Sequence, residues 1–77
     1  MKVNDFLLLF KEQYADYDEI HLDENIDFRT IDSYDSLTGM AIMVMLKDQF
    51  GVEITDIEYK SLHTVKEVYE FVMSKTK

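Results

Sequence analysis

The sequence predicts an all-α protein, a small four-helix bundle of three main helices and one short helix with a long first loop. Proline is absent and glycine occurs only twice, and no segment sustains the alternation of apolar and polar residues that marks a strand. Three segments instead repeat apolar residues at the spacing of a helix face. A chain of 77 residues is expected to form one domain, residues 1–77.

The first helix is predicted over roughly residues 3–15. Asn4 and Asp5 stand where a side chain can accept hydrogen bonds from free backbone amides at the helix start. The apolar face of this helix consists of Val3, Phe6, Leu7, Phe10 and Tyr14. A connection from Asp16 to Asp35 follows, and a connection this long is usually functional or packed by its own side chains. Its apolar anchors are Ile20, Leu22, Ile26, Phe28 and Ile31.

The second helix is predicted from Ser36 to Phe50, with Asp35 or Ser36 as its N-cap and Gly51 just beyond its end. A short helix is predicted around residues 56–60. The last helix opens with Thr64, and Glu67 follows at the spacing of a capping box. Its apolar stripe consists of Val65, Val68, Tyr69, Val72 and Met73.

The charge balance and the lack of cysteine limit the partners and the chemistry that are expected of this protein. Sixteen acidic against eight basic residues give a net charge of −8, which disfavours nucleic acid and anionic membranes and favours partners with basic patches. Without cysteine, any thiol that the protein uses must come from elsewhere. The apolar run near the N-terminus is too short for a signal peptide or a membrane span. We expect a cytoplasmic monomer that does not contact membranes.

The acidic first loop raises the question of a calcium site. Asp23, Asn25 and Asp27 reproduce the first three ligand positions of an EF-hand loop. The sixth position, which needs glycine, is Phe28, and the twelfth, which needs glutamate, is Tyr34. We therefore interpret the segment as a solvated acidic loop and expect no metal site. His21 and His63 are far apart in sequence and are expected to be ordinary surface residues.

Two Asp-Ser pairs precede the second helix, at residues 32–33 and 35–36. No Gly-x-Ser-x-Gly motif is present, so neither serine is expected to be a hydrolase nucleophile and the chain is not expected to be an enzyme. Ser36 stands at a helix start, where unpaired amides and the helix dipole favour a phosphate ester. Taken alone, this position favours a simple helix cap, provided by Ser36 or Asp35, over a modified serine.

The segment from Asp35 to Val72 resembles the acyl carrier proteins. In that family Asp-Ser-Leu opens the second helix, an aromatic residue closes it, and a Glu-Ile pair precedes a Thr-Val step into the last helix. The matching residues are Asp35, Ser36 and Leu37, then Phe50, Glu53 and Ile54, and then Thr64, Val65, Val68 and Val72. No gap is needed from Ser36 to Val72, and an aromatic residue that the family often has eight places before the serine is matched by Phe28.

The resemblance implies that a phosphopantetheinyl transferase attaches 4′-phosphopantetheine to Ser36. Acyl groups would then be carried as thioesters on the thiol of this arm, in fatty acid or a related specialised biosynthesis. Asp35 would position the serine, and Leu37 would belong to the surface that partners recognise. Acyl-loading and acyl-processing enzymes, namely synthase components and acyltransferases, are the partners implied. Ser33 is followed by Tyr34, so it lacks the leucine that accompanies the modified serine.

Two departures from the family are apparent. Where the family has an apolar residue and then glycine before its motif, this chain has Asp32 and Ser33. Many members present acidic residues on the second helix to basic patches of partner enzymes, but here one acid remains. The matching partner surface is Leu37, Met40, Ala41, Val44, Lys47 and Asp48.

Every residue from Met40 to Leu46 is apolar, so part of this run either thickens the core or meets solvent or a partner. The second possibility predicts a carrier that docks by apolar contact in a specialised pathway. Two alternatives stay open: a carrier for an amino acid or polyketide unit, and a non-carrier acidic helical interaction module in which Ser36 is only a cap.

Overall fold

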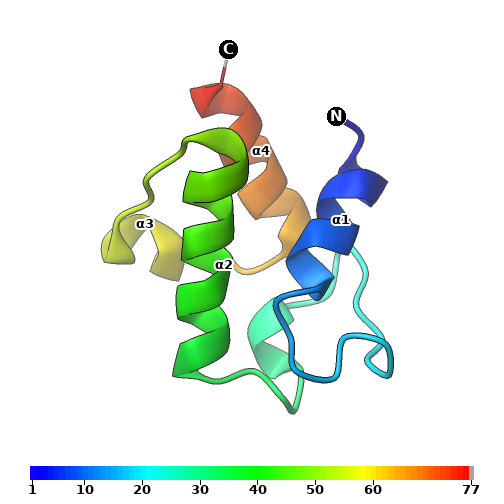
Figure 1. Ribbon diagram of the computed structural model, residues 1–77. Helices are drawn as coiled ribbons and strands as arrows, with labels where there is room; N and C mark the ends of the chain where they lie inside the picture. Colours follow the sequence, from blue (N-terminus) through cyan, green and yellow to red (C-terminus); the bar gives the residue numbers. More distant parts are fainter. Residues whose placement is uncertain (77) are drawn as a thin grey trace.

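Four α-helices and one turn of 3-10 helix follow one another along residues 1–76, the part of the chain that the computed structural model describes (Figure 1). The elements are α1 (Val3–Lys11), η1 (Phe28–Thr30), α2 (Ser36–Phe50), α3 (Asp56–Ser61) and α4 (Val65–Lys75). The predicted bundle of three main helices and one short helix is confirmed. Within residues 1–76, β pairing is limited to one isolated bridge between Asp27 and Thr64. Helix α1 packs against both α2 and α4.

The start and the end of α1 both differ from the prediction. The N-cap is Lys2, whose side chain makes no capping hydrogen bond, so Asn4 and Asp5 do not have the predicted role. The helix ends at Lys11 rather than near residue 15, and two tighter turns then bring Tyr14 into the core. The Tyr14 hydroxyl donates a 2.5 Å hydrogen bond to the carbonyl of Phe28. This contact with the first loop favours the turn over a further turn of helix.

Aromatic rings from α1, the first loop, the end of α2 and α4 pack together in the core. Phe6 contacts the rings of Phe50 and Tyr69 at centroid distances of 5.5 and 5.4 Å, and Phe10 meets Phe28 at 4.9 Å. Edge and tilted contacts of this kind add to the free energy of apolar burial. Along α4 the predicted stripe faces inward, with its three valines buried and Tyr69 and Met73 partly buried.

The caps of α2 and α4 are those that their sequences predict. Asp35 is the N-cap of α2, and Gly51 ends it in the left-handed conformation at φ 68°, where glycine is favoured. Thr64 and Glu67 form a complete capping box on α4. A second capping box, on α3, was missed although its Thr-x-x-Glu spacing is visible in the sequence. It joins Thr55 and Glu58 and explains how six residues form a stable helical turn.

Arg29 joins the first loop to the end of α3. Its guanidinium donates 2.6 Å hydrogen bonds to the carbonyls of Leu62 and Tyr59, and it lies 4.6 Å from the ring centroids of both Phe28 and Tyr59. Both carbonyls lie at the end of α3, and that of Tyr59 also accepts a backbone hydrogen bond from the Leu62 amide. A backbone hydrogen bond of 3.1 Å from the Phe28 amide to the His63 carbonyl supports the same junction. Arg29 therefore connects η1 to α3.

Gly39 is explained by the side chain of Tyr34. A Cβ atom at Gly39 would lie 2.7 Å from the Tyr34 hydroxyl oxygen, closer than non-bonded atoms approach. That hydroxyl is held 2.9 Å from the hydroxyl of Tyr59. The glycine, which is otherwise unfavourable within a helix, thus makes room for a tyrosine pair between the loop and α3.

Gly39→Ala is expected to destabilise the protein by about 1 kcal/mol, although alanine is the better helix former by a similar amount, because the tyrosine pair must move. In a Tyr34→Phe background the hydroxyl is gone and the nearest ring carbon lies at an ordinary 3.5 Å. There the same substitution is expected to stabilise by about 1 kcal/mol. Equilibrium urea unfolding of the four proteins measures both values. Effects of the same sign in both backgrounds would contradict this explanation.

Candidate functional site

Asp35 holds the turn that leads into α2. Its Oδ1 accepts hydrogen bonds from the backbone amide of Thr38 at 2.9 Å and from the Thr38 hydroxyl at 3.1 Å. The Thr38 side chain is buried and also approaches the carbonyl of Ser33 at 3.5 Å. Thr38, which was not singled out from the sequence, thereby fixes both Asp35 and the loop before it.

These hydrogen bonds change the acidity of Asp35. The Thr38 amide, and then the Thr38 hydroxyl, donate to the carboxylate and lower the pKa of Asp35 below its ordinary value. The lowered pKa extends the pH range in which Asp35 is ionised, beside Ser36, toward more acidic values. A negative charge at this position is also favoured by the positive end of the helix dipole.

The stability of the fold is expected to depend on the ionisation of Asp35. Because its pKa is lower in the folded than in the unfolded state, its contribution is fully present above the ordinary aspartate pKa of about 4. The contribution is lost as the pH falls through the folded-state pKa. Asp35→Asn keeps a capping acceptor but does not titrate. The stability of the wild type relative to Asp35→Asn is thus expected to be constant above about pH 5 and to fall on acidification, as measured by urea unfolding. If the free energies of unfolding of the wild type and Asp35→Asn differ by the same amount at every acidic pH, this prediction is wrong.

The two serines of the Asp-Ser pairs lie in different environments. Ser36 is the first residue of α2 and is exposed. The Ser33 hydroxyl oxygen is buried and has no hydrogen-bond partner among residues 1–76. An enzyme that modifies a serine hydroxyl must reach it from solvent, so the accessible member of the pair is Ser36.

An exposed apolar stripe runs along α2 from the residue after Ser36. Leu37, Met40 and Val44 are 71%, 61% and 57% exposed, whereas Ile42 and Leu46 are fully buried. The apolar run from Met40 to Leu46 is therefore divided between the core and the surface. Ala41 is partly buried beside this stripe, and Lys47 and Asp48 are exposed at its far end. The Lys47 ammonium pairs with Glu53 rather than with Asp48.

A cavity of about 250 Å³ lies between α2 and α3, and Ser36 is among its lining residues. Met40 and Met43 line it from α2, and Asp56, Tyr59 and Lys60 line it from α3. Tyr34, Arg29 and Gly39 complete the lining. The helix start that carries Ser36 therefore adjoins both an apolar surface stripe and a small cavity.

Comparison with known proteins identifies the family of this fold. The model of a family described as a phosphopantetheine attachment site matches residues 11–72, which include α2, α3 and most of α4. The chain belongs to this phosphopantetheine-attachment family. The resemblance to the acyl carrier proteins is confirmed. The prosthetic group attached to members of this family is 4′-phosphopantetheine.

The curated relatives of this chain include three proteins named acyl carrier protein. The protein of Thermosynechococcus vestitus is 42% identical over 41 residues, which cover 53% of this chain and 51% of the relative. Those of Myxococcus xanthus and Micrococcus luteus are each 45% identical over 38 residues, covering 49% of this chain and 48% and 47% of the relatives. The chain thus spans about half the length of the curated relatives it matches.

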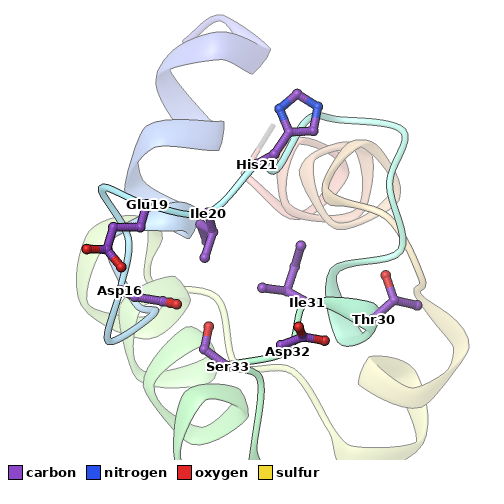
Figure 2. Close-up of a pocket in the computed structure, with 8 residues that line it drawn as sticks. All are labelled: Asp16, Glu19, Ile20, His21, Thr30, Ile31, Asp32 and Ser33. Carbon is purple, nitrogen blue, oxygen red and sulfur yellow. The ribbon is translucent and has the colours of Figure 1, made fainter.

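The acidic first loop contains a further pocket of about 360 Å³, lined by residues 16, 19–21 and 30–33. Figure 2 shows the Asp16 carboxylate and the Ser33 hydroxyl directed into it, whereas His21 points away. One carboxylate oxygen of Asp16 is buried there without a hydrogen-bond partner among residues 1–76. Within those residues, no group of three or more His, Asp or Glu side chains is arranged to hold a metal ion.

The two histidines lie apart and at the surface. His21 is 3.9 Å from Asp23, and His63 is 3.8 Å from Asp27, with all four side chains well exposed. Each histidine has one carboxylate nearby, a proximity that the sequence analysis did not predict for either. Among residues 1–76, no helix combines the length and the apolar character needed to cross a bilayer.

Proposed function

We propose that this chain carries acyl groups as thioesters on 4′-phosphopantetheine attached to Ser36. The observation that supports Ser36 most directly is its exposure at the start of α2, in contrast to the buried hydroxyl of Ser33. A match to the phosphopantetheine-attachment family over residues 11–72 supports the prosthetic group. Membership of the family of acyl carrier proteins supports acyl groups as the cargo.

The residues around Ser36 fit a phosphodiester. Its oxygen belongs to the first turn of a 15-residue helix, where free amides and the dipole stabilise negative charge. Asp35 is tied to Thr38, so the residue before the serine has a fixed conformation that a transferase can recognise. The prosthetic group supplies the thiol on which the cargo is held, and the chain itself contains no cysteine.

The chain acts in this proposal as a carrier, and the bonds of the cargo are made and broken by partners. The partners are a phosphopantetheinyl transferase and the acyl-loading and acyl-processing enzymes of the pathway. We further propose that residues 1–77 form one carrier domain that works as a monomer in the cytoplasm. The absence of cysteine supports that compartment, because it suits a reducing environment.

Intact mass spectrometry tests the proposed function directly. The purified protein is incubated with coenzyme A and a phosphopantetheinyl transferase of broad specificity, and is weighed before and after. A gain of one phosphopantetheine group per chain is expected. An unchanged mass, with a known carrier modified in the same reaction, would refute the carrier function and favour the interaction module in which Ser36 is only a helix start.

The exposed stripe of Leu37, Met40 and Val44 is proposed as the surface to which these enzymes dock. It begins at the residue after Ser36, so an enzyme seated on it also reaches the serine. Ala41, Lys47 and Asp48 complete the surface. The positive charge of Lys47 is offset by Glu53, which leaves apolar contact as its main means of binding. We propose on this basis a specialised pathway rather than general fatty acid synthesis.

Binding to a ketosynthase of general fatty acid synthesis is expected to be weak and to depend little on salt. The physical reason is that an apolar stripe offers few charges for a basic patch to attract, whereas binding through ion pairs weakens as salt screens them. The dissociation constant is measured by calorimetry at low and high salt, with a carrier of acidic second helix as the control. Tight binding that weakens strongly with salt and is lost in Asp48→Asn would contradict apolar docking.

A further inference from the structure

We propose that Thr38 is a positioning residue for the attachment of the arm, because its hydroxyl holds the Asp35 carboxylate in one orientation beside Ser36. The inference rests on the proposed function, in which a transferase recognises the start of α2 and modifies Ser36. Thr38 acts in this proposal through Asp35, and it contacts neither the arm nor the reacting hydroxyl.

The polar side chain of Thr38 is buried at an otherwise exposed helix start. Thr38 is 6% exposed, whereas the three residues before it, Asp35, Ser36 and Leu37, are all exposed. Burial of a hydroxyl is unfavourable unless the hydroxyl has a hydrogen-bond partner. The Thr38 hydroxyl has that partner in Asp35 Oδ1, at 3.1 Å. The side chain therefore connects the buried face of α2 to an exposed carboxylate.

The hydroxyl adds a contact that the helix cap itself does not require. As the N-cap, Asp35 accepts a 2.9 Å hydrogen bond from the Thr38 amide, and any residue except proline supplies such an amide. The hydroxyl contact depends on the threonine side chain. Its single proton has two acceptors in reach, and the carboxylate at 3.1 Å is a stronger acceptor than the Ser33 carbonyl at 3.5 Å.

Two donors on one oxygen restrict the rotation of the Asp35 carboxylate. With the amide alone, the carboxylate could turn about its last bond and exchange one oxygen for the other, because this torsion has a broad energy minimum. The Thr38 hydroxyl donates to the same Oδ1 atom from the side chain and opposes that turn. Neither of these hydrogen bonds uses Oδ2. Because Asp35 is exposed, Oδ2 is presented in a fixed direction to an enzyme that approaches Ser36.

A carboxylate that is already oriented favours recognition by the transferase. An enzyme that binds a group held in one orientation does not lose the free energy of ordering that group. The Thr38 hydroxyl also helps to lower the pKa of Asp35, after the larger effect of the Thr38 amide, so it favours the charged form. Both effects are present before the enzyme binds, and we therefore expect them to lower KM and to leave kcat nearly unchanged.

The test measures the rate of arm transfer from coenzyme A by a phosphopantetheinyl transferase at several concentrations of the chain, with intact mass as the readout. Thr38→Val retains the branched shape but has no hydroxyl. Its kcat/KM is expected to be about tenfold lower than that of the wild type through a raised KM, the factor that one ordinary hydrogen bond gives. Thr38→Ser has a hydroxyl again and is expected to stay within about threefold of the wild type.

Two comparisons separate positioning from stability. Thr64→Val removes a threonine hydroxyl from the capping box of α4, so it is expected to destabilise the fold but to leave kcat/KM within about twofold of the wild type. Asp35→Gly removes the carboxylate, and glycine is tolerated as an N-cap. In that background Thr38→Val is expected to change kcat/KM by less than about twofold, because the group that Thr38 orients is gone.

Circular dichroism checks the folding of each variant. If Thr38→Val does not fold, Thr38→Ala, which also lacks the hydroxyl, replaces it in both backgrounds.

Each outcome has a distinct meaning. The role of Thr38 is overturned, and the carrier function stands, if Thr38→Val is modified as efficiently as the wild type or if Thr64→Val loses as much. The same holds if Thr38→Ser is as slow as Thr38→Val, if the loss lies in kcat alone, or if it persists in the Asp35→Gly background. A wild-type chain that gains no arm overturns the carrier function and the role of Thr38 together.

Discussion

Ser36→Ala is expected to abolish the gain of a phosphopantetheine mass, whereas Ser33→Ala is expected to keep it in full. The first variant removes the exposed hydroxyl at the start of α2, to which the proposal assigns the arm. The second removes a hydroxyl that is buried without a partner and is not accessible to a transferase. Both proteins are incubated with transferase and coenzyme A beside the wild type, and each is weighed intact.

Both serine variants are expected to stay folded, so a difference in mass gain reports on the hydroxyl that was removed. The N-cap of α2 is Asp35, so Ser36 can be replaced without loss of the cap, and alanine is a good helix former. The free energy of unfolding of both variants is expected to stay within about 0.5 kcal/mol of the wild type. Circular dichroism checks this. A mass gain that survives Ser36→Ala, or that is lost in folded Ser33→Ala, would place the arm elsewhere.

Arg29→Ala is expected to lower the free energy of unfolding by about 2–4 kcal/mol. The variant loses two hydrogen bonds from a charged group, each contributing roughly 1.5–3 kcal/mol when well buried, and the value is reduced because Arg29 is partly exposed. It also loses stacking on the rings of Phe28 and Tyr59. Few surface substitutions have effects of this size.

Arg29→Lys is expected to recover only part of the loss, because an ammonium does not span two carbonyls as the guanidinium fork does. Lys66→Ala, which removes an exposed cation from α4, is the matched control and should stay within about 0.5 kcal/mol. Equilibrium urea unfolding measures all three. If Arg29→Ala is as stable as Lys66→Ala, the connection between loop and α3 contributes little.

The role of Arg29 extends from stability to the candidate site. Helix α3 has only six residues, and an isolated helix of that length is not stable in water. Its position depends on the capping box at Thr55 and on contacts at its other end, where Arg29 binds the carbonyls. Since α3 forms one wall of the cavity beside Ser36, the residue that holds α3 also holds the shape of that cavity.

The sequence predicted one part of the candidate site and did not predict another. Its helix start, cap and apolar stripe follow from residues close together between Asp35 and Val44. The cavity beside Ser36 does not follow from the sequence, because the residues that line it come from three segments that meet only in the folded chain. Arg29 appeared in the sequence as a lone cation among acids, and no local pattern indicates that its partners are 30 and 33 residues away.

The sequence by itself determined where α2 begins and ends and how α4 is capped, and its register predicts Ser36 rather than Ser33 as the modified serine. Caps and helix faces depend on residues three or four places apart, so their signals are local. Only the tertiary structure decided that α1 ends at Lys11, that Gly39 receives Tyr34, and which apolar residues of α2 face solvent. These outcomes depend on contacts such as that of Tyr14 with Phe28, between residues far apart in the chain, where packing overrides local preference.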